Sequence, residues 1–394
     1  MFFAITGAHF DGNKFAEEAL NKGASFAVID NEDYKKNEQY LVVDDALKAM
    51  QQLASFHRTY LNIPIIALTG SNGKTTTKEL INSVLSKTYK TSATIGNLNN
   101  HIGVPLTLLS MNETCEIGIV EMGANHQKEI DFLCQIAAPD YGLITNFGKA
   151  HLEGFGGFEG VIKGKSELYN YLKLHNKIIF VNTNDALQIK QIGTYNKTIF
   201  FGKNTTLVDA QPYVTLHYKN DLLKTQLTGS YNYHNICVAI TLGDYFKVPK
   251  EAIISAIENY TPSNNRSQII HQNGHQIILD AYNANPSSMI AALKNFEKLN
   301  NTNKVVILGD MFELGKTAAD EHQYISDEVN KFNFQKMIFV GSHFYNIRHK
   351  NKNSSYFNTY ESLLDSFSDF KFEKQLFLIK GSRGMALERL LNVI

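Results

Sequence analysis

The most constraining feature of this sequence is an alternation of short apolar runs with helix-like segments, which begins just after Pro64. Four of the runs read IIALTG, EIGIVEMG, YGLITNFG and KIIFVNTN, and helical spacing of apolar residues separates them. Apolar strands joined by helical crossovers indicate a parallel sheet with helices on both faces. The expected fold class is therefore α/β, with a central P-loop-type parallel sheet of the kind that binds nucleotides.

Three blocks divide the 394 residues, which are too many for one ordinary core. Residues 1–62 predict a small α/β domain that ends in an amphipathic helix, and residues 63–261 hold the central sheet. Residues 262–394 begin with two strand-like segments paired across Asn273-Gly274, and KVVILGDM, KMIFVGSHF and KQLFLIKGS follow with helices between them. This block predicts a second doubly wound domain, which is Rossmann-like.

Composition narrows the classes of function. The 38 basic side chains balance 38 acidic ones, so the chain has no general attraction to nucleic acid or to a membrane surface. Its three cysteines are far apart in apolar surroundings, which indicates reduced core residues. The sequence shows neither an apolar run of membrane-spanning length nor a basic segment leading into an apolar signal region. We expect a cytoplasmic protein without membrane insertion.

The stretch ALTGSNGKTTTKEL carries the strongest local motif. An apolar strand runs into Gly70 and Gly73, and Lys74 and Thr75 follow at the start of a helical pattern. The loop is a shortened phosphate-binding loop, because Leu68 occupies the usual first glycine position. Its N–H groups would face an anion, the lysine adds a positive charge, and the threonine hydroxyl suits Mg²⁺. ATP is the expected ligand; the alternative is an ordinary turn between a strand and a helix.

Further polar residues follow the next strands. Glu121 ends the strand EIGIVE, so it is expected at the carboxyl edge of the sheet, where it would bind Mg²⁺ or simply leave the core. His151 lies on the glycine-rich segment KAHLEGFGGFEG, as a second ligand or as polar surface. Lys163 and Lys165 lie in a segment with helical spacing, and the residues alone indicate a solvent-exposed helix face.

Nine segments are similar, in order and spacing, to those of the Mur ligases: TGSNGKTT, GNLNNHIGVPLTLL, EMGANHQKEI, AHLEGFGGFEGVIKGKSEL, GSYNYHN, NRSQ, DAYNANPSSM, LGDMFELG and KGSRGMALE. The resemblance covers nearly the whole chain and is to the branch that joins D-alanyl-D-alanine to UDP-N-acetylmuramoyl-tripeptide. It implies an ATP-dependent amide ligase of peptidoglycan precursor synthesis, acting as a monomer. It also implies a UDP-substrate-binding N-terminal domain, an ATP-binding central domain and a Rossmann-like C-terminal domain.

The resemblance also implies the chemistry. ATP would phosphorylate the last carboxylate of the tripeptide, and the dipeptide amine would then attack the acyl phosphate. The implied catalytic residues are Lys74, Lys165 and His151, and the implied Mg²⁺ ligands are Thr75, Glu121, His151 and Lys165. Lys165 would serve as a carbamate formed with CO₂, because an ammonium group would repel the metal. Lys163 is the alternative lysine.

Other positions match the nucleotide and substrate contacts of the family. The residues implied to bind ATP are Gly70, Ser71, Asn72, Gly73, Lys74, Thr75, Thr76, Asn232, Asn235, Arg266 and Asp280. Those implied to bind the other substrates are Asn99, Asn100, Asn283 and Arg383. Helix capping is the alternative role for Asn232 and Asn235, and Tyr231 stands where the family pattern has a histidine. A structural ion pair is the alternative for Arg383.

Two comparisons within the family complete these expectations. Members ordinarily carry a further segment before the FFAITG strand, so we expect an incomplete N-terminal domain or a misassigned start, with weaker UDP binding. The segment AITGAHFDGNKFA still resembles the uridine-side loop. A diaminopimelate- or lysine-adding ligase would carry an Asp-Asn-Pro-Arg type signature where this chain has GDMFELG. A folylpolyglutamate synthase and a nucleotide-binding protein without ligase activity are the remaining alternatives.

Overall fold

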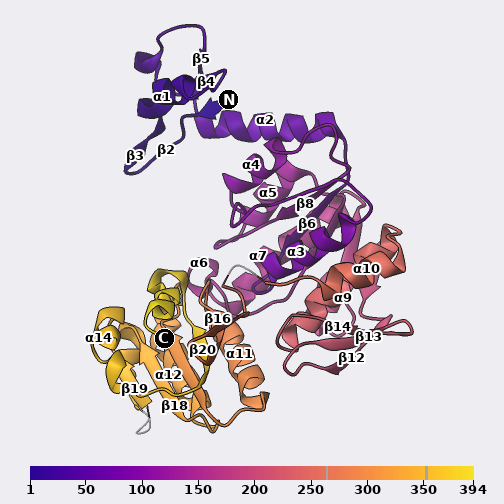
Figure 1. Cartoon of the computed structure of the whole chain (residues 1–394). Coiled ribbons are helices and arrows are strands. Elements are labelled where there is room, and N and C mark those ends of the chain that lie inside the picture. Colours follow the sequence, from indigo (N-terminus) through magenta and orange to yellow (C-terminus); the bar gives the residue numbers. More distant parts are fainter. Residues whose placement is uncertain (263–264, 351–353) are drawn as a thin grey trace.

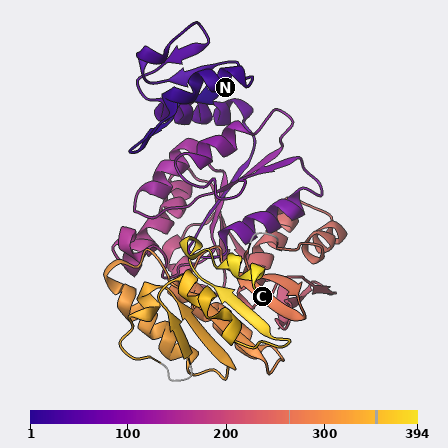
Figure 2. The same ribbon diagram turned by 60° about the vertical axis from the view of Figure 1, so that its left-hand side comes forward.

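The computed structural model describes residues 1–262, 265–350 and 354–394. The chain forms three α/β units that follow one another along the sequence (Figure 1). The central unit lies between the N-terminal and C-terminal units (Figure 2). In these described ranges, no helix combines the length and the apolar character needed to cross a membrane.

The N-terminal unit is a small parallel sheet with strand order β1-β4-β5 and a short helix packed on it. Its core is formed by Ala4, Ala16, Ala27, Ile29 and Tyr40. The long helix α2 leads from this sheet to the central unit. The elements are β1 (Phe2–Phe3), β2 (Thr6–Gly7), β3 (Phe10–Asp11), η1 (Gly12–Phe15), α1 (Ala16–Asn21), β4 (Ala27–Ile29), η2 (Glu32–Tyr34), β5 (Tyr40–Val42) and α2 (Ala46–Leu61).

The central unit contains six parallel strands in the order β11-β10-β9-β6-β8-β7. Every residue of β6 and of β8 is buried, because helices cover both faces. Ile65 and Ala67 of β6 share a core with α4, α5 and α7. Ile66 and Leu68, the alternate residues, share the other core with α3, α9 and α10. The parallel, doubly covered sheet predicted from the apolar runs is confirmed.

The strands of this sheet are β6 (Ile65–Thr69), β7 (Thr91–Ala93), β8 (Ile117–Glu121), β9 (Tyr141–Ile144), β10 (Ile178–Asn182) and β11 (Thr198–Phe201). The helices are α3 (Lys74–Leu85), α4 (Gly103–Leu109), α5 (Glu129–Ala137), α6 (Leu152–Phe155), α7 (Phe158–Leu174), α8 (Ala186–Ile192), α9 (Tyr231–Tyr245) and α10 (Lys250–Glu258). A small antiparallel sheet, which the sequence analysis did not predict, packs in the same core as α9 and consists of β12 (Thr205–Asp209), β13 (Thr215–Tyr218) and β14 (Asp221–Lys224).

The C-terminal unit has a six-stranded sheet with order β15-β16-β20-β17-β18-β19. Its first two strands pair antiparallel across Asn273 and Gly274, which have φ of 49° and 81°, as the turn-forming dipeptide predicted. The remaining pairs are parallel. The strand β19 was not predicted, because its sequence SSYF is half polar and every residue is only half-buried.

The strands of the C-terminal unit are β15 (Gln268–Gln272), β16 (His275–Asp280), β17 (Lys304–Gly309), β18 (Lys336–Val340), β19 (Ser354–Phe357) and β20 (Leu376–Lys380). The helices are α11 (Pro286–Lys298), η3 (Gly315–Thr317), α12 (Ala318–Val329), α13 (Ser342–Tyr345), α14 (Tyr360–Asp365), η4 (Phe367–Asp369), η5 (Arg383–Met385) and η6 (Leu387–Asn392). The predicted doubly wound pattern is therefore present, with one strand more than the apolar runs indicated.

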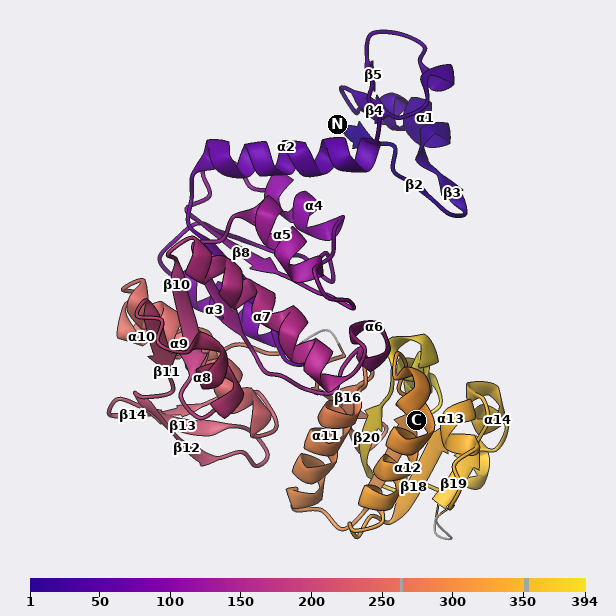
Figure 3. The ribbon, with the colours of Figure 1, turned by 180° about the vertical axis from the view of Figure 1, so that it is seen from behind.

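Helix α2 lies across α4 and α5 and carries the N-terminal sheet at its first end (Figure 3). Arg58, near its last turn, donates hydrogen bonds to Ala137 O and Ala138 O, each at 3.0 Å. The same guanidinium pairs with Asp140 at 2.8 Å. The second half of α2 is therefore fixed on the central unit by buried polar contacts as well as by apolar packing.

Candidate active site

A cavity of about 710 Å³ lies at the carboxyl edge of the central sheet, between the central and C-terminal units. Most residues predicted from the sequence line it: Ser71, Asn72, Gly73, Lys74, Thr75, Thr76, Asn99, Asn100, Glu121, His151, Asn232, Asn235, Arg266, Asp280 and Asn283. Gly70, Lys165 and Arg383 are not lining residues. Each of them contacts a lining residue: Gly70 contacts Lys74, Lys165 contacts Ala124, and Arg383 contacts Tyr282.

The phosphate loop connects β6 to α3 and is held by the loop that follows β9. Gly70 has φ of 144°, and a Cβ there would lie 2.0 Å from Thr145 Oγ1, so only glycine fits. Thr145 Oγ1 donates to Asn72 O at 2.6 Å, and Asn72 N donates to Asn146 Oδ1 at 3.1 Å. Lys74 Nζ donates to Gly70 O at 2.7 Å. Contacts within the protein thus determine the shape of the loop.

Lys74 and Glu121 face the same part of the cavity. Burial lowers the pKa of the Lys74 amine from its usual value, and the Glu121 charge opposes this shift. Glu121 is 1% exposed, and its Oε1 accepts a hydrogen bond from Asn99 Nδ2 at 2.8 Å. Its Oε2 and the Thr75 hydroxyl are buried without a hydrogen-bond partner among the described residues. Buried oxygens left without partners fit the ligand set of a hard cation such as Mg²⁺.

The two lysines of α7 lie in different environments. Lys165 is 1% exposed, whereas Lys163 is exposed to solvent, since side chains two residues apart on a helix differ by about 200°. Lys165 Nζ donates to Ala124 O at 3.0 Å and lies 4.9 Å from the centroid of the Phe155 ring. Burial lowers the pKa of Lys165 well below its usual value, and the charge of Lys74 adds to the effect. The exposed helix face indicated by the residues alone is therefore correct for Lys163 and wrong for Lys165.

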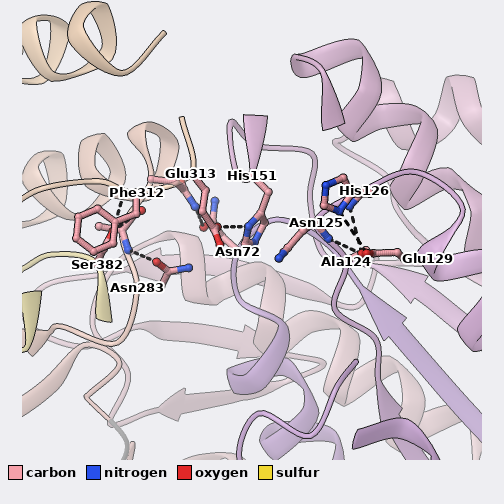
Figure 4. A network of polar contacts seen from close by, with 12 residues as sticks. Asn72, Ala124, Asn125, His126, Glu129, His151, Asn283, Phe312, Glu313 and Ser382 are labelled. Carbon is pink, nitrogen blue, oxygen red and sulfur yellow. Dashed lines mark hydrogen bonds and ion pairs between the residues drawn. The ribbon is translucent and has the colours of Figure 1, made fainter. Parts of the chain in front are cut away.

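His151 and Glu313 connect the central and C-terminal units. The two side chains point toward one another and form an ion pair through His151 Nδ1 (Figure 4). This pairing holds the pKa of the Glu313 carboxyl below its usual value. Beside it, Glu153 N donates to Glu313 O at 3.2 Å. The segments AHLEGFG and LGDMFELG, which the sequence analysis did not place relative to each other, are thus in direct contact.

Asn232 and Asn235 are buried at the beginning of α9. Asn235 Nδ2 donates to Asn232 Oδ1 at 2.9 Å, and Asn232 Nδ2 donates to Thr228 O at 2.8 Å. A Cβ on Gly73 would lie 2.9 Å from Asn235 Oδ1, so the pair lies against the phosphate loop. The cap position of α9 is Ser230, and neither asparagine occupies it. The helix-capping alternative for these asparagines is therefore wrong.

A polar network links the C-terminal sheet to α9. Asp280 and Lys380 end the neighbouring parallel strands β16 and β20 in register. Lys380 Nζ donates to Asp280 Oδ2 at 2.5 Å and to Asn283 O at 3.2 Å. Asp280 Oδ1 accepts from Ser267 N at 3.2 Å, and Ser267 Oγ lies 2.8 Å from Tyr231 Oη. Asp280 is therefore held in position by Lys380 and by the backbone of Ser267.

The predicted substrate asparagines form local contacts at the rim of the cavity. Asn99 Nδ2 is engaged by Glu121, as described above. Asn100 Oδ1 accepts from Gly103 N at 2.9 Å at the start of α4. Asn283 Oδ1 accepts a hydrogen bond from Ala284 N at 2.8 Å, which leaves the side-chain NH₂ group of Asn283 available. Each of the three therefore keeps at least part of its polar capacity for a ligand.

The lining residues that sequence reasoning missed include four polar ones at strand ends, namely Asn146, Tyr282, Asn285 and Lys380. Each lies at the end of a strand or a few residues beyond it, where the carboxyl-edge argument would have found it. Asn285 Nδ2 donates to Asn72 Oδ1 at 2.7 Å, which joins the C-terminal unit to the phosphate loop.

Comparison with known proteins agrees with this geometry. The model of the Mur ligase middle domain matches residues 68–243, and that of the Mur ligase, glutamate ligase domain matches residues 265–383. The UDP-N-acetylmuramoyl-tripeptide--D-alanyl-D-alanine ligase of Bacillus subtilis (strain 168) is 33% identical over 412 residues, which cover 100% of this chain and 89% of the relative. The chain belongs to the Mur ligase family. A ligase of the same name from Escherichia coli (strain K12) is 31% identical over 411 residues, covering 100% of this Mur ligase and 90% of the relative.

Solved structures show the same architecture. A crystal structure of MurF from Acinetobacter baumannii superposes with a TM-score of 0.88 at 29% identity, covering 99% of this chain and 89% of that one. A crystal structure of MurF ligase from Thermotoga maritima in complex with ADP gives a TM-score of 0.85 at 25% identity, covering 99% and 92%. This Mur ligase therefore has the multi-domain α/β fold that the sequence predicted.

Proposed function

We propose that this Mur ligase joins D-alanyl-D-alanine to UDP-N-acetylmuramoyl-tripeptide at the expense of ATP, as a cytoplasmic step of peptidoglycan precursor synthesis. One observation carries the proposal. A single cavity is lined by the phosphate loop, by the buried carboxylate of Glu121 and by Arg266 and Asp280 near the C-terminal sheet. Similarity to ligases of this name, over the whole of this chain and about nine-tenths of each relative, supports the same reaction.

The reaction needs two steps because a carboxylate is a poor acceptor of an amine until one oxygen becomes a leaving group. In the first, an oxygen of the tripeptide carboxylate bonds to the γ-phosphorus of ATP, and the bond from that phosphorus to ADP breaks. In the second, the dipeptide nitrogen bonds to the acyl carbon, phosphate leaves with its oxygen, and the nitrogen gives up a proton. The products are the amide, ADP and phosphate.

ATP would lie with its phosphates on the phosphate loop. Backbone N–H groups at the start of α3 would face the phosphates, and Lys74 would meet the charge that develops during phosphoryl transfer. Arg266 would meet the phosphates from the C-terminal side. The adenine would lie by Asn232 and Asn235, and the ribose by Asp280, which Lys380 and Ser267 already orient.

The residues present also fit a divalent cation. The Thr75 hydroxyl and Glu121 Oε2 are buried oxygens without a partner in the described part of the chain, and His151 would contribute a nitrogen. Mg²⁺ bound there would neutralise phosphate charge. Lys165 would join this site as a carbamate, because burial favours its neutral amine, which is the form that adds CO₂.

The other substrates would take the remaining surfaces. Asn99, Asn100 and Asn283 lie at the rim of the cavity, where the tripeptide end and the dipeptide would meet. Arg383 would receive the dipeptide carboxylate. The N-terminal unit would bind the UDP portion, and we propose a monomer as the working state.

Phosphate release tests the function directly. The unsubstituted enzyme is incubated with ATP and Mg²⁺, together with both substrates, with either one alone, or with L-alanyl-L-alanine in place of the D,D-dipeptide. We expect sustained phosphate release only with both correct substrates, together with an amide product whose mass equals the sum of the two substrates minus water. Equal release without the dipeptide would show a simple ATPase and would contradict the proposal.

A further inference from the structure

The arginines of this chain divide into two groups. The sequence contains five, and three of them pair with carboxylates: Arg58 with Asp140, Arg348 with Asp320 and Arg389 with Glu361. Arg266 and Arg383 have no carboxylate within 4.0 Å in the described ranges of the chain. The two arginines without a carboxylate partner lie beside the candidate active site.

Both of these arginines lie on one aromatic ring. The guanidinium carbon of Arg266 is 3.7 Å from the centroid of the Tyr282 ring, and that of Arg383 is 5.0 Å from the same centroid. The three residues come from different segments, because Arg266 precedes β15, Tyr282 follows β16 and Arg383 follows β20. Strands β16 and β20 are parallel neighbours, so the last two segments leave the sheet at the same edge.

This arrangement holds positive charge without neutralising it. A ring face attracts a guanidinium and leaves its N–H donors directed outward, toward an anion. The carboxylate at the end of β16, Asp280, accepts hydrogen bonds from Lys380 Nζ at 2.5 Å and from Ser267 N at 3.2 Å. Two cations that share a ring and lack a counter-charge favour the arrival of anionic ligands.

The position of the ring connects two sides of the site. Tyr282 and Arg266 line the cavity, whereas Arg383 is exposed outside it. An anion in the cavity would meet one guanidinium, and an anion approaching from solvent would meet the other. Both guanidinium groups contact the Tyr282 ring.

We propose that Tyr282 is a positioning residue that holds Arg266 for the phosphoryl group of ATP and Arg383 for the terminal carboxylate of the dipeptide. This inference rests on the proposed function and adds to it a residue to which no role in the reaction was assigned. The aromatic face is the essential part of Tyr282, and its hydroxyl is not. Loss of the aromatic face should therefore weaken the binding of both ATP and the dipeptide and leave the binding of the UDP substrate unchanged.

Steady-state kinetics of two variants test this directly. Tyr282→Leu removes the aromatic face, and we expect KM to rise about tenfold for D-alanyl-D-alanine and several-fold for ATP, with KM for the UDP substrate unchanged. Tyr282→Phe keeps the face and should recover most of that loss. Tyr345→Leu is the matched control, because Tyr345 also carries a cation, Lys350, 4.1 Å from its ring centroid, but does not line the cavity. A Phe variant as impaired as the Leu variant would overturn the proposal.

A spectroscopic readout separates this inference from the proposed function. The chain contains no tryptophan, so Tyr282→Trp introduces a single indole that keeps a face for both arginines. D-alanyl-D-alanine alone, and a nonhydrolysable ATP analogue alone, should each change its emission as one guanidinium moves toward the ligand. Tyr345→Trp should not respond. If the unsubstituted enzyme binds both ligands and the Tyr282→Trp emission stays constant with each, the positioning role is wrong even where ligation proceeds. If the emission responds to both ligands but the unsubstituted enzyme forms no amide, the proposed function fails, whereas the contact of Tyr282 with the two ligand-binding arginines stands.

Discussion

His151 and Glu313 form an ion pair between the central and C-terminal units, and both have left-handed backbone, with φ of 53° and 62°. This backbone is unfavourable for residues other than glycine, so the packing of both loops must maintain it. Because His151 Nδ1 faces the carboxylate, Nε2 is the ring atom left to meet a metal. The contact therefore relates the orientation of a proposed Mg²⁺ ligand to the position of the C-terminal unit.

Substitution of Glu313 by glutamine removes the charge and keeps the shape of the side chain. We expect the Mg²⁺ concentration for half-maximal phosphate release to rise about tenfold, because a carboxylate that orients a ligating histidine supports metal binding. Glu328→Gln is the control, since Glu328 pairs with Lys331 at the C-terminal end of α12, outside the cavity. An unchanged Mg²⁺ requirement in Glu313→Gln would show that the pair only fastens the two units together.

Replacement of Lys74 by alanine should remove ATP turnover without unfolding the protein. The expected loss of kcat is about 10²- to 10³-fold, by analogy with removal of one donor to a transition state. Lys87→Ala is the control, because Lys87 is exposed just beyond the same helix. Circular dichroism on heating checks that both variants remain folded. Near-normal ATP turnover by Lys74→Ala would contradict the assignment of this segment as a phosphate-binding loop.

The burial of Lys165 leads to a rescue experiment. If Lys165 is carbamylated, Lys165→Ala should be nearly inactive, and formate or acetate should restore part of the activity by placing a carboxylate in the vacated space. Chloride at equal ionic strength should not, because screening alone would act on any variant. Phosphate release measures each combination.

Lys163→Ala provides the matched control for this experiment, since Lys163 lies on the same helix with its side chain in solvent. It should keep full activity and show no response to formate. A fully active Lys165→Ala enzyme would rule out the carbamate and leave the ligase function standing.

The stability of the C-terminal unit should depend on pH through His322. This ring is fully buried, stacks on His343 at 4.9 Å between centroids and accepts a hydrogen bond from Met311 N at 2.9 Å. Burial lowers the pKa of His322 from its usual value of 6.5. His322 therefore binds a proton more readily in the unfolded chain than in the folded one. Its contribution to the free energy of unfolding is full above about pH 6.5 and is lost as the pH falls below that value.

Urea unfolding at about pH 7.5, 6.5 and 5.5 measures the effect, with a slope of at most about 1.4 kcal/mol per pH unit for one proton. The difference in unfolding free energy between the unsubstituted protein and His322→Gln should shrink toward low pH. His9→Gln, at an exposed position, should follow the unsubstituted protein throughout. A constant difference between the unsubstituted protein and His322→Gln would show that His322 binds its proton equally in both states.

Local patterns were enough to locate the residues at strand ends. The apolar run that ends at Glu121 and the glycines before Lys74 each predict a position from their own neighbours, because a parallel sheet gathers the ends of its strands at one edge. The contrast between Lys163 and Lys165 required more. Helical spacing predicts that the two side chains point in different directions. Only the contacts with Phe155 and Ala124 determine that the Lys165 side chain is the buried one.

Contacts between the units were beyond the reach of these patterns. Asn72 and Asn285 are 213 residues apart, and nothing in either segment indicates that they form a hydrogen bond at 2.7 Å. The same holds for His151 with Glu313 and for Tyr282 with its two arginines. The edge strand β19 was missed for a different reason, since a half-buried strand at the border of a sheet needs no apolar run.

Helix α2 connects the N-terminal sheet to the central unit, so the tilt of this helix determines the position of the sheet. The helix has 16 residues and is therefore about 24 Å long, and its second half is fixed to the central unit by Arg58. If the helix tilts about Arg58, the arm from there to Ala46 is about 18 Å long, and a tilt of about 10° would move its far end by about 3 Å. Such a displacement is about the length of a hydrogen bond. With the proposed function, a slight rotation of one helix would adjust the distance between the UDP portion of the substrate and its reacting carboxylate.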